Sequence, residues 1–392
     1  MLTAQVKVSM RRSSVWSCCV LLLLLATGCD DPSAVGIGLI GEEGLPVTVR
    51  LPADSVLTAS QKDRTGNTAR VLAGRVADPL VGTLSATGYV DFVMSGTALV
   101  DTTIVGVRLE MPRDYVYGDT LGSVTLALHD MTEDWPYAGV GTDTTLSAGP
   151  LVRTFTFAPT DTLVQVDLPA EWIAAHDTTF RSSTFSTSFH GFQLAPDEGN
   201  AVVGFRFSEI RLLVFTATDT VTFTASKVLT TVARETLPSL PEDRVLLQDG
   251  LGQVVRLRFD FSADSVREAG LHAAVLEVPI DSVQLKQTPA GFVRPLPATV
   301  RLIGVNAEGN VPVTSLGEPI VLATTTPEGG RLRFRLGSTS LQTLQRLMLG
   351  ETPVRYLQLE FPTDDNALSP LLLYAGPTLR PTLILMVTPP SP

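Results

Sequence analysis

The sequence has little cysteine and little histidine, and this excludes several kinds of chemistry. Its three cysteines, Cys18, Cys19 and Cys29, lie at the N-terminus, so no disulfide framework can hold the rest of the chain. The four histidines are scattered without the spacing of a metal site, and no phosphate loop, dinucleotide fingerprint or serine-hydrolase motif occurs. We therefore expect neither an enzyme nor a bound cofactor or metal.

Basic residues are also scarce. Beyond residue 28 the chain keeps 26 basic and 40 acidic residues, because the leading segment holds three of the 29 Lys and Arg residues and none of the acids. The resulting charge of −14 argues against nucleic acid as a partner, and against an anionic membrane surface held by the body of the protein.

The N-terminus has the pattern of an export signal. Lys7, Arg11 and Arg12 precede an apolar stretch that ends at Ala26-Thr27-Gly28-Cys29. A basic flank, a short apolar core and small residues at its end are typical of a secretory signal peptide. The last four residues resemble the bacterial lipobox, in which the cysteine is acylated and becomes the first residue after cleavage. This predicts a signal peptide over residues 1–28 and a lipid on Cys29; the alternative is an ordinary signal peptide with an incidental cysteine.

Beyond the signal, short runs of Val, Leu, Phe and Thr alternate with polar residues, which is typical of strands. The clearest are Val105–Met111, Val124–His129, Leu163–Leu168, Arg211–Phe215, Val254–Phe261, Thr299–Ile303 and Arg331–Leu336. Two short helices are expected, at Pro169–His176 and Ser338–Met348, with Trp172 in the core. The fold class is therefore all-β, with antiparallel, jelly-roll-like β-sandwich domains.

Comparison of the chain with itself indicates two similar halves. Matching segments occur in the same order, among them Leu109-Glu-Met with Leu276-Glu-Val, Gly191-Phe-Gln-Leu with Tyr356-Leu-Gln-Leu, and Tyr89-Val-Asp-Phe with Arg258-Phe-Asp-Phe. We predict a Gly-rich tether over residues 29–48 and tandem β-sandwich domains over residues 49–218 and 219–392.

One aromatic cluster is a candidate binding site. Trp135 and Tyr137, with Asp134 beside them, have the composition of a platform on which a sugar ring stacks. The alternative, which the low aromatic content of 6% favours, is that Trp135 anchors its loop on the edge of the sandwich.

Two acidic loops recur at equivalent points of the halves, Asp197–Asn200 and Asp364–Asn366. Oxygen-rich loops can hold calcium. Asp, Asn and Gly are also what a tight turn between strands needs, and this second interpretation is favoured.

Several segments resemble the lipoproteins grouped as domain of unknown function 4270. They are Cys29-Asp-Asp-Pro, the stretch Val71–Thr83 with Asp78-Pro79-Leu80-Val81-Gly82, and Gly191–Pro196. That family has no established activity, so the resemblance implies a location in the cell envelope and no mechanism. Arg256–Phe261 and His129–Trp135 are also similar to secreted β-sandwich modules of the DNRLRE and carbohydrate-binding type.

Together these features predict a non-enzymatic lipoprotein of the cell envelope, anchored by membrane lipid on Cys29 and facing the periplasm or the cell exterior. Its role would be structural, adhesive or binding, with an envelope glycan or protein as partner. A carbohydrate-binding lipoprotein is the alternative, and a hydrolase comes third.

Overall fold

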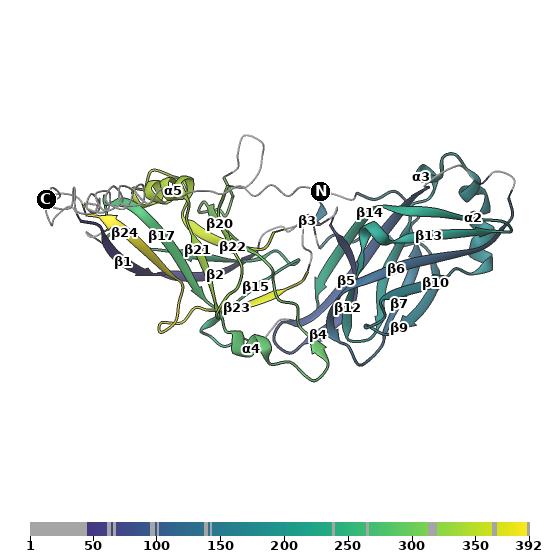
Figure 1. Cartoon of the computed structure of the whole chain (residues 1–392), viewed down its shortest axis with the longest axis horizontal. Coiled ribbons are helices and arrows are strands. Elements are labelled where there is room, and N and C mark those ends of the chain that lie inside the picture. Colours follow the sequence, from purple (N-terminus) through teal and green to yellow (C-terminus); the bar gives the residue numbers. More distant parts are fainter. Residues whose placement is uncertain are drawn as a thin grey trace, which may run out of the picture.

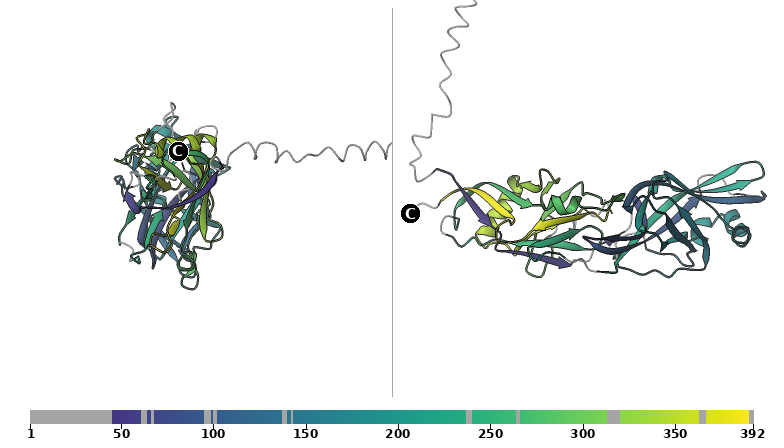
Figure 2. Two further views of the ribbon diagram at one scale, coloured as in Figure 1. Left: turned by 90° about the vertical axis from the view of Figure 1, so that its left-hand side faces the viewer. Right: turned by 90° about the horizontal axis from the view of Figure 1, so that it is seen from below.

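The computed structural model describes residues 45–389, except 61–63, 66–67, 95–98, 100–101, 137–139, 142, 237–239, 264–265, 313–319 and 363–366. It is an all-β protein whose strands pair antiparallel in two lobes that lie end to end (Figure 1). Figure 2 shows the same two lobes in line from below. The first and last described strands lie in one lobe, which we call the terminal lobe, and the other lobe is inserted between its second and third strands, so we call it the inserted lobe.

The inserted lobe holds strands β3 to β14 and the helices between them. Its strands are β3 (Arg64–Thr65), β4 (Arg70–Asp78), β5 (Gly82–Met94), β6 (Ile104–Asp119), β7 (Val124–Asp130), β8 (Val140–Gly141), β9 (Leu151–Phe157), β10 (Leu163–Asp167), β11 (Phe192–Glu198), β12 (Ala201–Arg206), β13 (Arg211–Thr216) and β14 (Thr220–Arg234). Its helices are α2 (Ala170–Arg181), α3 (Phe185–Ser188) and the 3-10 turn η3 (Phe207–Glu209).

The terminal lobe holds the first two strands and nine of the last ten. They are β1 (Val47–Pro52), β2 (Ser55–Ser60), β15 (Arg244–Gln248), β16 (Gln253–Arg258), β17 (Gly270–Pro279), β19 (Val300–Val305), β20 (Val321–Thr325), β21 (Arg331–Arg335), β22 (Tyr356–Glu360), β23 (Pro370–Tyr374) and β24 (Thr382–Thr388). The tenth, β18 (Phe292–Val293), pairs with β6 of the inserted lobe. Its helices are α4 (Ser282–Lys286) and α5 (Ser338–Met348).

Each lobe buries an apolar core between layers of sheet. In the terminal lobe, Leu383 and Leu276 of the four-stranded sheet pack with Leu257 and Leu359 of the seven-stranded sheet. In the inserted lobe the sheet turns back on itself, because β14 pairs with both β13 and β5. Alternation of apolar and polar residues places the apolar side chains of each strand on the inner face.

The two lobes share one pattern of strand pairing. The order β9-β7-β11-β5-β4-β12 of the inserted lobe corresponds to β20-β19-β22-β16-β15-β23 of the terminal lobe. The remaining strands correspond too, since β14-β13-β6 with β10 on β6 matches β1-β24-β17-β21. The ladders place the predicted match of Leu109 and Leu276 in register: Leu109 pairs with Leu212, and Leu276 pairs with Leu383.

The strand that completes each lobe comes from the other half of the sequence. Strand β14 follows the first repeat's last strand along the chain and pairs back onto it, whereas β1 and β2 cross to the terminal lobe and pair with β24 and β16. The predicted domains of residues 49–218 and 219–392 follow the repeats of the sequence but differ from these folded lobes at both boundaries. Self-comparison finds alike segments, but tertiary packing decides which sheet each linking strand joins. The predicted tether also ends earlier than residue 48, because β1 starts at Val47.

The predicted strands and helices lie where expected, apart from their ends. The second helix has the predicted bounds, Ser338–Met348, and the first runs on to Arg181. Trp172 is buried, as predicted, and its indole Nε1 donates a hydrogen bond of 2.8 Å to Asp130 Oδ2, which fixes α2 on β7.

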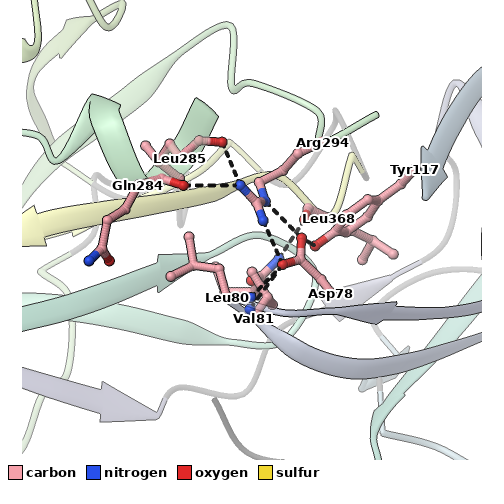
Figure 3. Close-up of polar contacts among 9 residues, drawn as sticks. Asp78, Leu80, Val81, Tyr117, Gln284, Leu285, Arg294 and Leu368 are labelled. Atoms are coloured by element: carbon pink, nitrogen blue, oxygen red, sulfur yellow. Dashed lines mark hydrogen bonds and ion pairs between the residues drawn. The ribbon is translucent and has the colours of Figure 1, made fainter. Parts of the chain in front are cut away.

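A buried ion pair joins the lobes (Figure 3). The Arg294 side chain is 2% exposed and that of Asp78 is 0% exposed, with 2.7 Å between Arg294 Nε and Asp78 Oδ2 and 2.7 Å between Arg294 Nη2 and Asp78 Oδ1. Tyr117 Oη donates to Asp78 Oδ2 at 2.8 Å, and the Leu80 amide donates to Oδ1 at 2.7 Å. The carboxylate is therefore surrounded by donors from both lobes, so the pair fixes how the lobes meet.

The hydrogen bonds around the Asp78 carboxyl favour its ionised form. Burial raises the pKa, but the hydrogen bonds from Arg294, Leu80 and Tyr117 outweigh it and hold the pKa below its usual value. Around the pair, side chains of both lobes form a further apolar core, in which the Tyr117 and Phe292 rings meet edge to face with 6.1 Å between their centroids. The joint between the lobes therefore has a packed apolar core of its own.

Candidate functional site

Three predicted sites lie outside the described residues. They are the lipid attachment residue Cys29, the aromatic residue Tyr137 and the loop Asp364–Asn366. Acylation of Cys29 therefore stays a prediction.

Trp135 does not offer a platform for a sugar. Its side chain is buried, at 3% exposure, and its indole Nε1 donates to the His190 carbonyl at 2.8 Å. One side of the ring lies 6.0 Å from the Tyr89 ring, and the Lys227 ammonium lies 4.6 Å from the ring centroid. A ring buried to this degree cannot stack on a sugar, so the stacking role is corrected to the alternative: Trp135 anchors its loop.

Asp134, the carboxylate beside it, lines a polar cavity of about 560 Å³. Its side chain is 76% exposed. The other lining residues come from β5, α3, the loop after α3 and β14, and are Asp91, Ser186, Thr187, His190, Ser226 and Lys227. Helix α3, which contributes Ser186 and Thr187 to the cavity, lies at the top of the inserted lobe in Figure 1.

Lys227 is the centre of this cavity's charge. Its Nζ lies 3.3 Å from Asp91 Oδ2, contacts Asp134 Oδ1 and sits over the Trp135 ring. Burial raises the pKa of Asp91 even though the Phe92 amide and Lys227 favour its charged form. Asp134 is exposed, and the hydrogen bond from Lys227 lowers its pKa. Besides this ion-pair cluster, the cavity is lined by three hydroxyl side chains and His190, and the exposed Asp134 carboxylate keeps a second oxygen for a ligand.

Such a lining can bind hydroxyl groups or amines by hydrogen bonds. Hydroxyls of Ser186, Thr187 and Ser226 can donate and accept, and Asp134 accepts. These are the groups with which proteins orient a polar ligand, such as a sugar.

Sequence reasoning found Asp134 but missed Asp91, Lys227 and His190. Lys227 and Asp91 face each other directly across the ladder between β14 and β5. That ladder joins residues far apart in the sequence, so no local pattern signals it. Opposite charges at matching strand positions are a usable signal only once the register is known.

The acidic loop Asp197–Asn200 forms the hairpin between β11 and β12. Asn200 Oδ1 accepts a hydrogen bond of 2.6 Å from the Ala77 amide, and Gly199 has a φ of +113°, which suits glycine. Asp197 and Glu198 are exposed. Within the described ranges, no group of three or more His, Cys, Asp or Glu side chains is placed to hold a metal ion.

In the part of the chain that the structure describes, no helix is long and apolar enough to cross a bilayer.

Comparisons with known proteins give no family. No family model matches the chain, and no curated protein matches it. Among solved structures, the C-terminal domain of the Streptococcus pyogenes antigen I/II-family protein AspA aligns at 8% identity over 83% of this chain and 91% of that one, with a TM-score of 0.18. A score this low carries no argument, and the resemblance to domain of unknown function 4270 stays a prediction.

Proposed function

We propose that this protein is a non-enzymatic, lipid-anchored component of the cell envelope that holds its inserted lobe away from the membrane. The observation that carries the proposal is where the chain enters the fold. Strand β1 pairs with β24 at the end of the terminal lobe farthest from the inserted lobe (Figure 1). A lipid on Cys29 would therefore place the terminal lobe next to the membrane and the inserted lobe beyond it.

The joint between the lobes supports this arrangement. The buried pair of Arg294 and Asp78 and the apolar core around it stiffen the link, so the inserted lobe would be presented at a fixed distance. The cavity around Lys227 would then belong to the lobe remote from the anchor.

The anchor is tested by metabolic labelling with a fatty acid. We expect the wild-type chain to be labelled and recovered with membranes, and the Cys29→Ser variant to be unlabelled. Cys18→Ser and Cys19→Ser are matched controls, because they remove thiols from the predicted signal peptide and should leave labelling intact. Labelling that persists in Cys29→Ser would contradict the proposal.

A second candidate function, glycan binding, is favoured by the polar lining of the Lys227 cavity. On a glycan array, Asp134→Asn should lose the signal of the wild-type chain. Glu133→Gln is the control, because Glu133 precedes Asp134 in the sequence, is exposed and does not line the cavity. Silence of the wild-type chain across a broad array counts against this candidate.

A further inference from the structure

The outer face of the four-stranded sheet in the terminal lobe carries a band of arginines. Alternate residues of β21 point outward, which places Arg331, Arg333 and Arg335 in one row, exposed to solvent. On the opposite edge strand, β1, Arg50 is exposed. We call these four residues the arginine face.

The ladders show how the two edges relate. Arg50 pairs with Ile384, Ile384 pairs with Val275, and Val275 pairs with Arg335. One row across the sheet therefore runs from an arginine over two apolar residues to an arginine. Met386, one pair further along β24, is 44% exposed and extends this apolar centre.

Few acidic side chains balance this charge. Glu277 lies on the same face and is shared by Arg333, at 3.2 Å, and Arg331, at 3.9 Å. Arg50 and Arg335 have no ion pair with a carboxylate among the residues that the structure describes. The face is thus strongly cationic on a chain whose net charge is −11. A net charge taken over the whole chain conceals it.

A cavity of about 380 Å³ opens beside the face and adds a further arginine. Arg50, Arg331 and Arg380 line it, together with one carboxylate, that of Glu277. Arg380 donates to the Ala53 carbonyl at 3.0 Å and to the Gly376 carbonyl at 3.1 Å, so its charge has only main-chain partners in these contacts. Arginine forks match the oxygens of a phosphate group, which makes this cavity suitable for a phosphorylated head group.

The position of the face selects its partner. Strand β1 is its edge, and Val47, where that strand begins, is 18 residues after Cys29, a span of at most roughly 60 Å. Leu45 and Leu379 are exposed apolar side chains near this strand, and Leu379 lines the cavity beside Arg50. A membrane that holds Cys29 is thus within reach of a cationic face with an apolar centre.

We propose that the arginine face binds the anionic phospholipid head groups of the membrane to which the protein is anchored. This inference rests on the proposed function for its biological setting. Arginines near an anionic surface are attracted to it within about a Debye length, and an apolar centre can contact the interface between head groups and acyl chains. The terminal lobe would then lie against the bilayer instead of hanging from its tether.

The test uses the whole chain with Cys29→Ser, so that no acyl chain contributes to binding. Flotation with vesicles of phosphatidylglycerol and phosphatidylcholine should recover the chain at low salt, and vesicles of phosphatidylcholine alone should not. Adding Arg50→Gln and Arg335→Gln should weaken binding roughly 30-fold, since about fivefold is expected for each arginine near the surface. Arg153→Gln with Arg267→Gln removes the same charge elsewhere and should leave binding within about twofold.

Two outcomes overturn the inference. One is an equal loss in the face variant and the control variant. The other is binding to a soluble polyanion, dextran sulfate, with no binding to the anionic vesicles. Neither outcome bears on acylation of Cys29, which the labelling experiment decides separately.

Discussion

The two lobes have one order of strand pairing but are completed by strands of different construction. In the inserted lobe a single strand, β14, runs along both β13 and β5 and bends at a bulge between Ala225 and Lys227. In the terminal lobe the same path is divided between β1 and β2, which are separated at Ala53 and Asp54. The topology therefore tolerates a break where a bulge would otherwise bend the strand.

The cores differ more than the topology does. The inserted lobe packs rings against one another, with Phe180, Phe185, Phe189 and Phe223 in mutual contact near Trp172. The terminal lobe fills the corresponding space mainly with leucine and valine. Because both cores support one pairing order, alternation of apolar residues specifies the topology and ring packing does not.

Removal of the exchanged strands tests the comparison most severely. Deleting residues 45–60 should unfold the terminal lobe, because β16 and β24 lose their partners and the core loses its cover. Hydrogen exchange followed by mass spectrometry should show lost protection in β16 and β24 and retained protection in β5 and β13. A peptide of residues 45–60 added in trans is expected to restore protection. Loss of protection confined to β5 and β13 would mean that β1 and β2 stabilise the inserted lobe instead of the terminal lobe.

Breaking the joint should have the next largest effect. Arg294→Met leaves the Asp78 carboxylate buried without its counter-ion, which typically costs about 3–5 kcal/mol in the free energy of unfolding. Adding Asp78→Leu should recover part of this loss, since the unpaired charge is removed. Urea unfolding measures both, with Arg113→Met as control because Arg113 bonds main-chain carbonyls at an exposed position. Equal stability of Arg294→Met and wild type would show that the lobes do not depend on the pair.

The joint should also weaken in acid. The pKa of Asp78 is lowered in the folded protein, so its contribution is present above the pKa of the unfolded chain and is lost as pH falls through the folded pKa. The difference in unfolding free energy between wild type and the double variant should therefore change in favour of the double variant at low pH. A difference that stays constant with pH contradicts an ionised pair.

The sequence predicted the elements well and their partners poorly. Alternation located the strands, and Ser338–Met348 was found with its observed bounds, because these signals are local. The repeat was visible because Leu109 and Leu276 keep the same surroundings. The exchange of linking strands was not visible in the sequence, because the alternating pattern of β14 fits either sheet.

In the candidate site, too, local features were predictable from the sequence and long-range contacts were not. Asp134 was identified from its local composition, but the burial of Trp135 depends on Tyr89 and His190, which come from distant strands and loops. The pairing of Arg294 with Asp78 joins residues 216 positions apart. Contacts of this range become predictable only once the register of the sheets is known.

The smallest expected effects come from two ion pairs that occupy corresponding places with their charges reversed. Phe192 pairs with Val90 and its counterpart Leu357 pairs with Leu257, so Arg258 corresponds to Asp91, and the match of Arg258 with Tyr89 predicted from the sequence is wrong by two residues. In the inserted lobe Lys227 of β14 pairs with Asp91 of β5. In the terminal lobe Arg258 of β16, opposite Ser55, pairs with Asp54 beside it. The first pair is largely buried, with side chains 15% and 6% exposed, and the second is open, at 56% and 43%. The burial of each pair, and not which strand carries the cation, should decide how much the pair contributes to the free energy of unfolding.

Lys227→Met should therefore cost about 1–3 kcal/mol of unfolding free energy, because Asp91 is left buried without its cation. Arg258→Met should cost about 0–1 kcal/mol, since exposed pairs contribute little. Burial raises the pKa of Asp91, so the penalty of its charge is present above the folded pKa and is relieved as pH falls through it. The cost of Lys227→Met should shrink over that range, whereas the cost of Arg258→Met should not follow it. Equal losses of unfolding free energy for the two variants at neutral pH would contradict this prediction. They would show that burial does not decide how much each ion pair contributes.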